Sequence, residues 1–263
     1  MAISGGIAGI MGNIGAGKST LANFLQSKRG LEILREHIPE KIPIRIINEP
    51  TDPYARKAFY SDREKYTDRF EISQAHLRIL RHIFANRFNL DDKTKKEEPG
   101  IVIFDRTLIE GYSIFGLNSF DDGFLTHRGL EEYNDLIRNA CDELGRNFPR
   151  ECSWLESTLF YLEVIDSKIL QKRQSERDDV DGSDGGQIPL EYLQKINKRY
   201  EDLTINTKEY YKKFGLSDPK IIKLNGSINI REKPEHLEEC ADKMGKNIWE
   251  MVEACSDLSG RYK

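Results

Sequence analysis

The sequence has little cysteine and no long apolar run. Its 263 residues contain four cysteines, Cys141, Cys152, Cys240 and Cys255, and none of them forms a C-x-x-C pair. This argues against a zinc site and, in a chain of this length, against a disulfide framework, so we expect free thiols in a reducing cytoplasm. No stretch approaches ~20 continuous apolar residues, and the first residues do not combine a basic region with an apolar run. We therefore expect neither a membrane span nor a signal peptide.

Positive charge is also not in excess. Lys plus Arg is 40 and Asp plus Glu is 44, which gives a formal net charge of −4. Coating nucleic acid nonspecifically needs a basic face, so this balance argues against a nucleic-acid partner. An anionic ligand remains possible if a local pocket binds it. The chain contains no internal repeat and no linker rich in Gly, Ser and Pro, and we predict one domain over residues 1–263.

Short apolar runs alternate with helical patterns along the chain. We expect strands at residues 7–11, 43–47, 101–104, 158–164 and 220–224. Apolar spacing predicts a helix from Lys18 onward and further helices over residues 61–90, 130–144, 188–211 and 235–254. This alternation predicts an α/β fold with a five-stranded parallel sheet and helices on both faces. Residues 178–186 are acidic and glycine-rich, which predicts a surface loop.

A phosphate-binding motif follows the first predicted strand. Residues 12–19 read GNIGAGKS and fit G-x-x-x-x-G-K-[ST]. Backbone N–H groups of such a loop, together with the N-terminus of the following helix, bind phosphate oxygens. Lys18 is expected to reach the β- and γ-phosphates, and the Ser19 hydroxyl to ligate Mg²⁺. The residues predicted to hold the nucleotide here are Gly12, Asn13, Ile14, Gly15, Ala16, Gly17, Lys18, Ser19 and Thr20.

Charged residues end the second and third predicted strands. Glu49 follows one, and Asp105 and Arg106 end the other. Ligands of open parallel sheets bind outside the carboxyl ends of the strands, so these side chains should share a crevice with the phosphate loop. Glu49 is the candidate base that accepts a hydroxyl proton. Asp105 is a candidate partner of Mg²⁺, and Arg106 can orient the base and neutralise the transferred phosphoryl group.

These segments, together with IPLEYL at residues 188–193, resemble the deoxyribonucleoside kinases. The resemblance extends from about residue 5 to residue 225, and the region after Glu49 is similar to the compact bacterial-type members. It implies the P-loop kinase fold, ATP and Mg²⁺ as donor, and phosphorylation of the 5′-hydroxyl of a deoxynucleoside. It also implies that Glu49 is the general base and that Arg106 is its partner at the acceptor oxygen.

The resemblance assigns further roles. Gln74 would pair with the edge of the base, Tyr60 would contact the sugar 3′-hydroxyl, and Arg81 could reach the base or the acceptor. Arg173 and Arg177 would close over the donor phosphates from a lid at about residues 172–187. The helix at 130–144 carries an apolar stripe, which in this family helps to build a homodimer and could equally belong to the core.

Two departures from the family pattern concern the substrate. The acidic segment interrupts the lid, and the nearest carboxylate before Ile188 that could hold the 3′-hydroxyl is Asp184. Gly111, with Glu110 beside it, stands where members selective for purines or cytosine carry an Asp. Losing that acceptor for an exocyclic amine mildly favours thymine or uracil, or a tolerant site.

Three other readings stay open at this point. A deoxynucleoside monophosphate kinase on the same scaffold would need extra cations, for which Arg56 and Lys57 are available. A non-catalytic kinase-like subunit would not need intact Lys18, Ser19 and Glu49. A nucleic-acid translocase would need a basic or aromatic-interleaved surface, and the sequence offers none.

Overall fold

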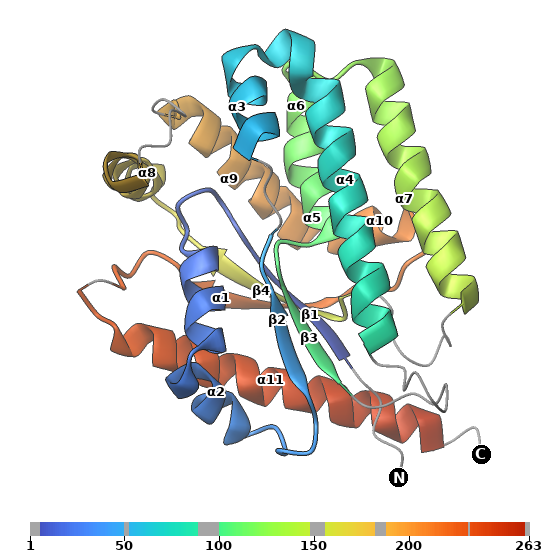
Figure 1. The fold of residues 1–263 in the computed structure, drawn as a ribbon, viewed down its shortest axis with the longest axis vertical. Coiled ribbons are helices and arrows are strands. Elements are labelled where there is room, and N and C mark those ends of the chain that lie inside the picture. The colour runs from blue at the N-terminus through green and yellow to red at the C-terminus, as the bar shows by residue number, and fades with distance from the viewer. Residues whose placement is uncertain are drawn as a thin grey trace.

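The apolar runs form a single sheet in the computed structural model, which describes residues 6–49, 53–88, 100–147, 156–181, 188–230 and 232–260. All pairings between its strands are parallel, and the strand order is β2-β3-β1-β4-β5 (Figure 1). The strands are β1 (Gly6–Gly12), β2 (Ile44–Ile47), β3 (Ile101–Asp105), β4 (Thr158–Glu163) and β5 (Lys220–Asn225). The expected five-stranded parallel sheet is confirmed.

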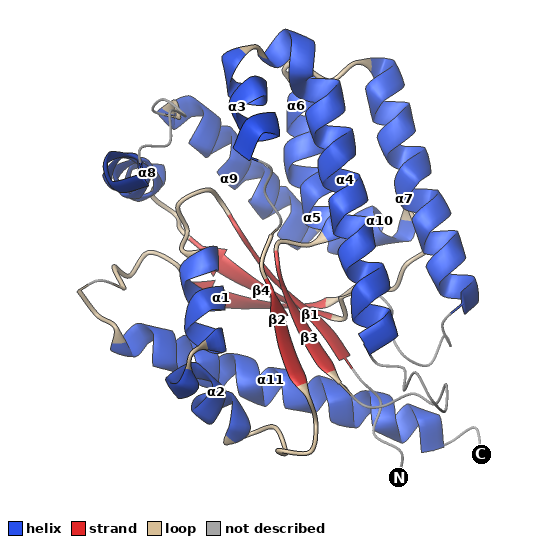
Figure 2. Cartoon of the chain, in the orientation of Figure 1, coloured by secondary structure: helices blue, strands red, loops and turns tan. Residues whose placement is uncertain are grey.

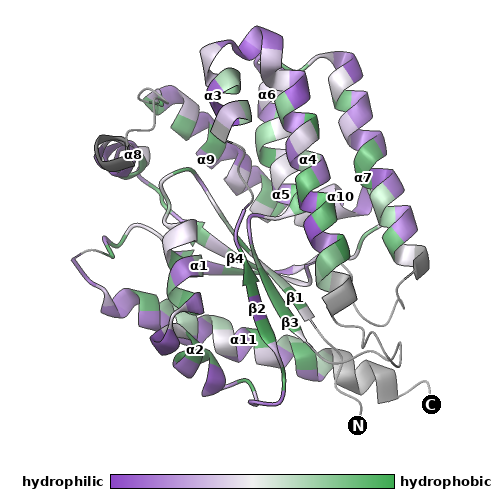
Figure 3. Ribbon diagram, viewed as in Figure 1, coloured by the Kyte–Doolittle hydropathy of each residue, from purple (hydrophilic) through white to green (hydrophobic). Residues whose placement is uncertain are grey.

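Helices cover both faces of this sheet (Figure 2). One face packs against α1 (Lys18–Gln26), α2 (Lys28–Arg35) and α11 (Glu235–Gly260). The other packs against α4 (Arg63–Phe88), α7 (His127–Asn147), α9 (Leu190–Ile205) and α10 (Thr207–Lys212). Apolar side chains of the strands fill both interfaces. Figure 3 shows hydrophobic colouring along the strands at the centre of the molecule. Burial on both faces explains why the central strands β1, β3 and β4 read as continuous apolar runs, whereas the edge strands β2 and β5 are partly exposed and contain charged residues.

Two long predicted helices are each divided in the structure. The prediction of one helix over residues 61–90 is wrong at its start, because α3 (Pro53–Ser61) ends before Asp62 and α4 begins at Arg63. The Asp62 carboxylate accepts the Lys65 N–H at 3.1 Å, as a residue that caps a helix N-terminus does. The 188–211 helix is interrupted at Asn206, between α9 and α10. Apolar periodicity continues across both breaks, which is why it does not reveal them.

Other elements depart from the predicted pattern. Helix α8 (Ser167–Asp181) continues four residues into the acidic segment expected to be a loop, and residues 182–187, with Asp184, lie outside the described residues. The chain after β3 forms α5 (Leu108–Glu110), the π-helical turn η1 (Gly111–Gly116) and α6 (Leu117–Asp121). Within the described ranges, no helix is both long and apolar enough to cross a membrane. Cys141 and Cys240 are free and buried.

Candidate active site

The loop between β1 and α1 has the backbone that a phosphate cradle requires. Gly15 and Gly17 have φ values of 80° and 96°, a region that side-chain-bearing residues rarely adopt. A Cβ at Gly15 would also lie 2.9 Å from the Leu170 carbonyl oxygen of α8. The Lys18 Nζ is buried and donates to the carbonyls of Gly12 and Asn13 at 2.7 and 3.0 Å. Burial, with repulsion from Arg106, lowers the pKa of Lys18 to about 8.

Gly12 and Asn13, the first two residues of the motif, hold this loop in place by hydrogen bonds to neighbouring elements. The Asn13 side-chain amide donates to the Leu193 carbonyl at 2.9 Å and to Asn197 Oδ1 at 2.6 Å, both on α9. Its Oδ1 accepts the Ile14 N–H at 2.7 Å. The Gly12 N–H donates to Glu110 Oε1 at 3.2 Å. The remaining predicted residues all line the cavity, and they are Ile14, Gly15, Ala16, Gly17, Lys18, Ser19 and Thr20.

Ser19 and Asp105 form a pair that fits a Mg²⁺ site. The Ser19 hydroxyl donates to Asp105 Oδ2 at 2.8 Å. The other carboxylate oxygen, Asp105 Oδ1, is buried and has no hydrogen-bond partner among the described residues. A hydroxyl and a carboxylate with a free lone pair, beside a phosphate loop, are the oxygen ligands that Mg²⁺ takes together with nucleotide phosphates. The residues present therefore fit the ion.

Glu49 is held between two arginines. The Arg106 Nε donates to Glu49 Oε2, and Arg78 Nη2 of α4 donates to Glu49 Oε1, both at 2.8 Å. Burial opposes ionisation, but the two guanidinium groups outweigh it and lower the pKa of Glu49 to about 2. The Arg106 guanidinium also lies 4.3 Å from the centre of the Phe115 ring. The carboxylate is therefore ionised and fixed in direction at the carboxyl end of β2.

The backbone that carries Arg106 is strained. Its φ is 66°, and it is the only non-glycine residue with a positive φ in the described part of the chain. The Arg106 N–H donates to the Ile10 carbonyl of β1 at 3.0 Å. Arg81 donates to the carbonyls of Asn48, Asp105 and Arg106 at 3.0, 3.0 and 2.7 Å. Arg81 thus ties together the ends of β2 and β3, which carry Glu49 and Arg106.

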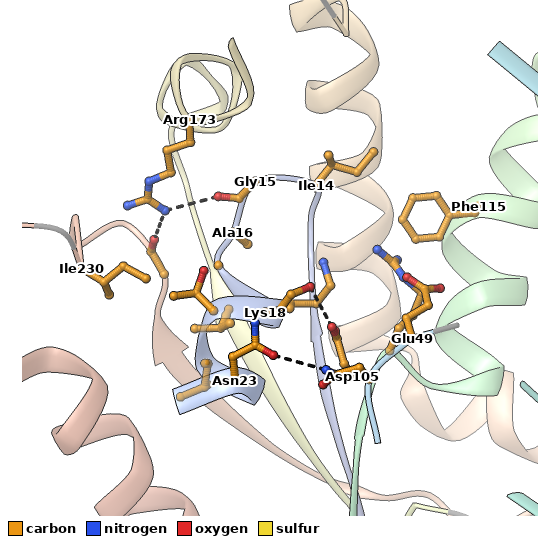
Figure 4. A pocket seen from close by; sticks show the side chains of 18 of the residues that line it. Ile14, Gly15, Ala16, Lys18, Asn23, Glu49, Asp105, Phe115, Arg173 and Ile230 are labelled. Atoms are coloured by element: carbon orange, nitrogen blue, oxygen red, sulfur yellow. Dashed lines mark hydrogen bonds and ion pairs between the residues drawn. The ribbon is translucent and has the colours of Figure 1, made fainter. Parts of the chain in front are cut away.

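A cavity of about 530 Å³ joins these groups, with the phosphate loop near its middle (Figure 4). One end lies between β1, α8 and the loop after β5, and Arg173, Asn225 and Ile230 line it. The other end lies over Glu49. Its walls are polar and aromatic side chains, namely Arg56, Phe59, Tyr60, Phe70, Glu71, Gln74, Arg78, Phe115 and Tyr192. An elongated ligand with a phosphate chain at one end and a flat ring at the other matches this lining.

The predicted residues are not all used as expected. Tyr60 and Gln74 line the end of the cavity over Glu49, whereas Arg81 does not line the cavity and its guanidinium donates to backbone carbonyls. Arg173 lines the opposite end, but it donates to the carbonyls of Gly226, Ser227 and Ile228 at 2.7 to 3.0 Å. The side chain of Arg177 lies outside the described residues. We therefore do not carry Arg81 forward as a substrate ligand.

Sequence reasoning missed three contributors to the site. Arg78 and Glu71 looked like polar positions on a helix, and only their spacing from Gln74 shows that they share its face. The sequence indicates Glu110 only as a neighbour of Gly111, yet its carboxylate accepts the N–H groups of Gly12 and Thr107 and lies 3.5 Å from Arg106 Nη1. Its position after the D-R-T segment, in the capping box with Thr107, was a signal that could have been used.

Known proteins resemble the chain over most of its length. The family model described as deoxynucleoside kinase matches residues 8–249. A deoxycytidine kinase of Mus musculus is 23% identical over 245 residues, which cover 88% of this chain and 87% of the relative. A deoxyadenosine/deoxycytidine kinase of Bacillus subtilis is 25% identical over 193 residues, which cover 73% of this chain and 74% of the relative.

A solved structure has the same fold. It is a deoxyadenosine kinase from M. mycoides with the products dCMP and a flexible dCDP bound. Its TM-score is 0.60 at 21% identity, and the match covers 90% of this chain and 98% of that one. The phosphate loop, the clamped Glu49 and the family match over residues 8–249 agree with one another. The chain belongs to the deoxynucleoside kinase family.

Proposed function

We propose that this protein transfers the terminal phosphoryl group of ATP, bound with Mg²⁺, to the 5′-hydroxyl of a deoxynucleoside. One observation carries the proposal. Glu49 is clamped at the mouth of an aromatic acceptor pocket, and the phosphate loop lies in the same cavity. A kinase that phosphorylates a hydroxyl needs a carboxylate at this boundary between acceptor and donor.

Glu49 accepts the hydroxyl hydrogen bond and directs the oxygen toward the donor. Its low pKa makes it a weak base. A weak base suffices because the bond to the hydroxyl oxygen is barely formed in a loose phosphoryl-transfer transition state, so the hydroxyl proton leaves late, after it has become acidic. Arg106 contacts both Glu49 and the acceptor side of the cavity, so its charge lies where negative charge develops. Arg78 holds the second carboxylate oxygen and fixes the direction of the pair.

The donor phosphates occupy the loop of residues 14–20. When the donor binds, Lys18 exchanges its hydrogen bonds to the Gly12 and Asn13 carbonyls for an ion pair with the phosphates. Ser19 and Asp105 are the residues that would hold Mg²⁺, and the ion would supply neutralisation of the phosphate charge. Arg173 keeps α8 against the loop after β5, and it reaches phosphate only by giving up its carbonyl partners. Arg177 remains a proposed phosphate ligand.

The acceptor deoxynucleoside lies among the aromatic residues beyond Glu49. Phe115 and Tyr192 provide ring surfaces for the base. Gln74, which is 4% exposed, presents an amide that can both donate and accept at a base edge. Tyr60, which is 41% exposed, lies at the rim and is available to the sugar 3′-hydroxyl.

A panel of acceptors tests this function. Purified protein is incubated with ATP and Mg²⁺ and, separately, with each deoxynucleoside and each deoxynucleoside monophosphate. We expect 5′-monophosphates from nucleosides as the fast reaction. Faster conversion of monophosphates would favour the other kinase, for which Arg56 is a cavity-lining cation. Absence of transfer to any acceptor, with nucleotide still bound, would identify a non-catalytic member.

A homodimer also remains a proposal. The apolar stripe of α7 packs into the core through Tyr133, Ile137 and Leu144, so that stripe does not itself require a partner. Helix α4, which packs beside α7, exposes Leu80 by 49% and Phe84 by 65%. Sedimentation equilibrium of the full chain measures the assembly state. A monomer at all accessible concentrations would contradict this proposal.

A further inference from the structure

Glu71 is a buried carboxyl inside the acceptor end of the cavity. It is 3% exposed and lines the cavity from α4. Ser119 of α6 donates to its Oε1 at 3.1 Å and is its one hydrogen-bond donor among the described residues. No salt bridge to Glu71 is formed within the described ranges. A carboxylate has about four lone-pair sites, so most of its accepting capacity is left to a ligand.

Gln74 lies one helical turn further along the same face. It also lines the cavity and is 4% exposed, yet its side-chain amide makes no hydrogen bond within the described part of the chain. The amide is therefore open to the cavity, where a ligand can complete its hydrogen bonds. Residues at i and i+3 are neighbours on a helix surface, so the amide and the carboxyl face the same ligand edge.

The order along α4 assigns this edge to the base. Arg78 clamps Glu49, where the 5′-hydroxyl is phosphorylated. Glu71 precedes Arg78 by seven residues, which is about 10 Å along the helix axis at 1.5 Å per residue. A nucleoside that places its 5′-hydroxyl at Glu49 therefore directs its opposite end, the outer edge of the base, toward Gln74 and Glu71. The aromatic residues Phe115 and Tyr192 line the same end.

Hydrogen-bond chemistry then selects among bases. Cytosine and adenine carry an exocyclic amine with two hydrogens beside a ring nitrogen that accepts. The Gln74 amide can donate to the ring nitrogen and accept one amine hydrogen, which leaves the second hydrogen for Glu71. Thymine and uracil present a carbonyl oxygen at the same place. An ionised carboxylate facing that oxygen brings two acceptors together and leaves both unsatisfied.

We propose that Glu71 is a specificity-determining residue that selects deoxynucleosides whose base carries an exocyclic amine. The proposal rests on the proposed function and names its substrate class. It replaces the mild preference for thymine or uracil that we expected from Gly111. On this proposal Glu71 of α4 supplies the carboxylate that is missing at position 111. A Cβ at Gly111 would lie 2.2 Å from Arg78 Nη1, so a larger side chain there would displace the arginine that clamps Glu49.

Glu71→Gln tests the proposal with a minimal ligand pair. Deoxycytidine and deoxyuridine differ in the amine or oxo group and in protonation of the adjacent ring nitrogen, and their binding is measured by calorimetry without donor. The wild type should prefer deoxycytidine, and Glu71→Gln should reduce this preference by about tenfold or more, the usual size of a hydrogen bond to a charged group. Glu64→Gln is the matched control, since Glu64 is exposed on the same helix. It should leave the preference unchanged.

The wild type offers a second, independent test through pH. Burial raises the pKa of Glu71 to about 7. The charged and titratable groups that face it are Arg63 and Arg78 on α4, Arg106 after β3, Tyr60 on α3, Tyr192 on α9 and Tyr133 on α7. Arginines stay protonated between pH 6 and 8, and the pKa values of these tyrosines are raised. The preference for deoxycytidine over deoxyuridine should therefore increase from pH 6 to pH 8.

The outcomes separate the inference from the function. An unchanged binding preference in folded Glu71→Gln, or a wild type that binds deoxyuridine as tightly as deoxycytidine at pH 8, overturns the role of Glu71. If Glu71→Gln does not fold, a pH-independent preference in the wild type overturns it. A wild type that prefers deoxycytidine but transfers no phosphoryl group to any acceptor supports Glu71 as a base reader and contradicts the kinase reaction.

Discussion

At the scale of single residues, the site depends on charges that are fixed by their neighbours. Glu49 has two guanidinium partners at 2.8 Å, so its direction does not depend on a bound substrate. Arg106 keeps a left-handed backbone conformation, which costs on the order of 1–3 kcal/mol and is held by Arg81. Strain of this kind, found at a residue that lines the cavity and holds Glu49, is consistent with a preorganised site rather than one assembled on binding.

Replacing Glu49 tests the acceptor side of the mechanism. Glu49→Gln keeps the shape but removes the negative charge and the proton acceptor, so kcat should fall by roughly 10²–10⁴-fold. Nucleotide binding, measured by fluorescence titration, should survive because the phosphate loop is a separate segment. Unchanged kcat would remove Glu49 from the reaction. Glu64→Gln, the same change at an exposed position, provides the control.

Lys18 gives nucleotide binding a pH dependence. Its pKa is lowered to about 8 in the free protein, so above pH 8 an increasing fraction of the protein carries a neutral lysine. Triphosphate binding favours the charged form, and it should therefore take up a proton and weaken as the pH rises from 8 to 9.5. Calorimetry in two buffers of different ionisation enthalpy measures this uptake. Equal heats at pH 8.5 in both buffers would contradict the prediction.

At the scale of elements, the polar contacts between segments set the position of the phosphate loop. Asn197 of α9 receives the Asn13 amide and donates to the Val164 carbonyl at 2.9 Å and the Ser167 hydroxyl at 3.0 Å. It therefore joins the loop to α9, the end of β4 and the start of α8. Each of these bonds is buried, so their partners cannot turn to water.

Asn197→Ala should thus destabilise the protein as well as loosen the loop. Three buried groups lose a partner, and the expected loss is about 2–4 kcal/mol in the free energy of unfolding. Denaturant titration measures it. Glu201→Ala, exposed one turn later on the same helix, should change stability by no more than about 0.5 kcal/mol. Equal effects of the two variants on the free energy of unfolding would show that the hydrogen bonds of Asn197 do not stabilise the fold.

The contact between η1 and α4 is close enough to require glycine. A Cβ at Gly111 would approach Arg78 Nη1 to 2.2 Å and Arg78 Cζ to 2.7 Å. Because a guanidinium can move more easily than backbone, Gly111→Ala should shift Arg78 away from Glu49 rather than unfold the chain. We expect kcat to fall by at least tenfold with a melting temperature within a few degrees of wild type. A large loss of stability with normal kcat would contradict this.

At the scale of the whole molecule, the chain order of strands and helices could be predicted because both faces of the sheet are covered. The central strands β1, β3 and β4 read as apolar runs, and the P-loop motif marks the first turn between strand and helix. Helix breaks at Asp62 and Asn206 could not be predicted, because apolar spacing continues through them. The short elements between Leu108 and Asp121 are too brief to produce a periodic signal.

Motifs located the donor half of the site better than the acceptor half. Residues 14–20 line the cavity as expected, because a phosphate cradle is a local feature of consecutive residues. The acceptor half is built by side chains from separate elements. The sequence therefore predicts Arg81 as a site residue, whereas the arginine that contacts Glu49 is Arg78, about one turn earlier on α4. Sequence spacing alone does not show which of two arginines on a helix faces the sheet edge and which faces the cavity.

The stability of the molecule should depend on pH through Glu71. Its pKa is about 7 in the folded protein and 4.5 as an ordinary glutamate, so the folded state prefers the protonated form. Stability is therefore lost as pH rises from about 4.5 to 7, and Glu71→Gln removes this cost. The variant should be more stable by up to roughly 3 kcal/mol at pH 8 and by less than about 1 kcal/mol at pH 5. Urea titrations at both pH values measure the difference, and an equal difference at both would contradict it.

Helix α4 carries Glu71, Gln74 and Arg78 on one rigid face, and this has a kinetic consequence. The first two face the proposed base edge, whereas the third sets the direction of Glu49. On the proposed function, a base that displaces this helix also turns Glu49, because Arg78 on the same helix holds that carboxylate. We therefore expect a poorly fitting nucleoside to lose turnover as well as affinity.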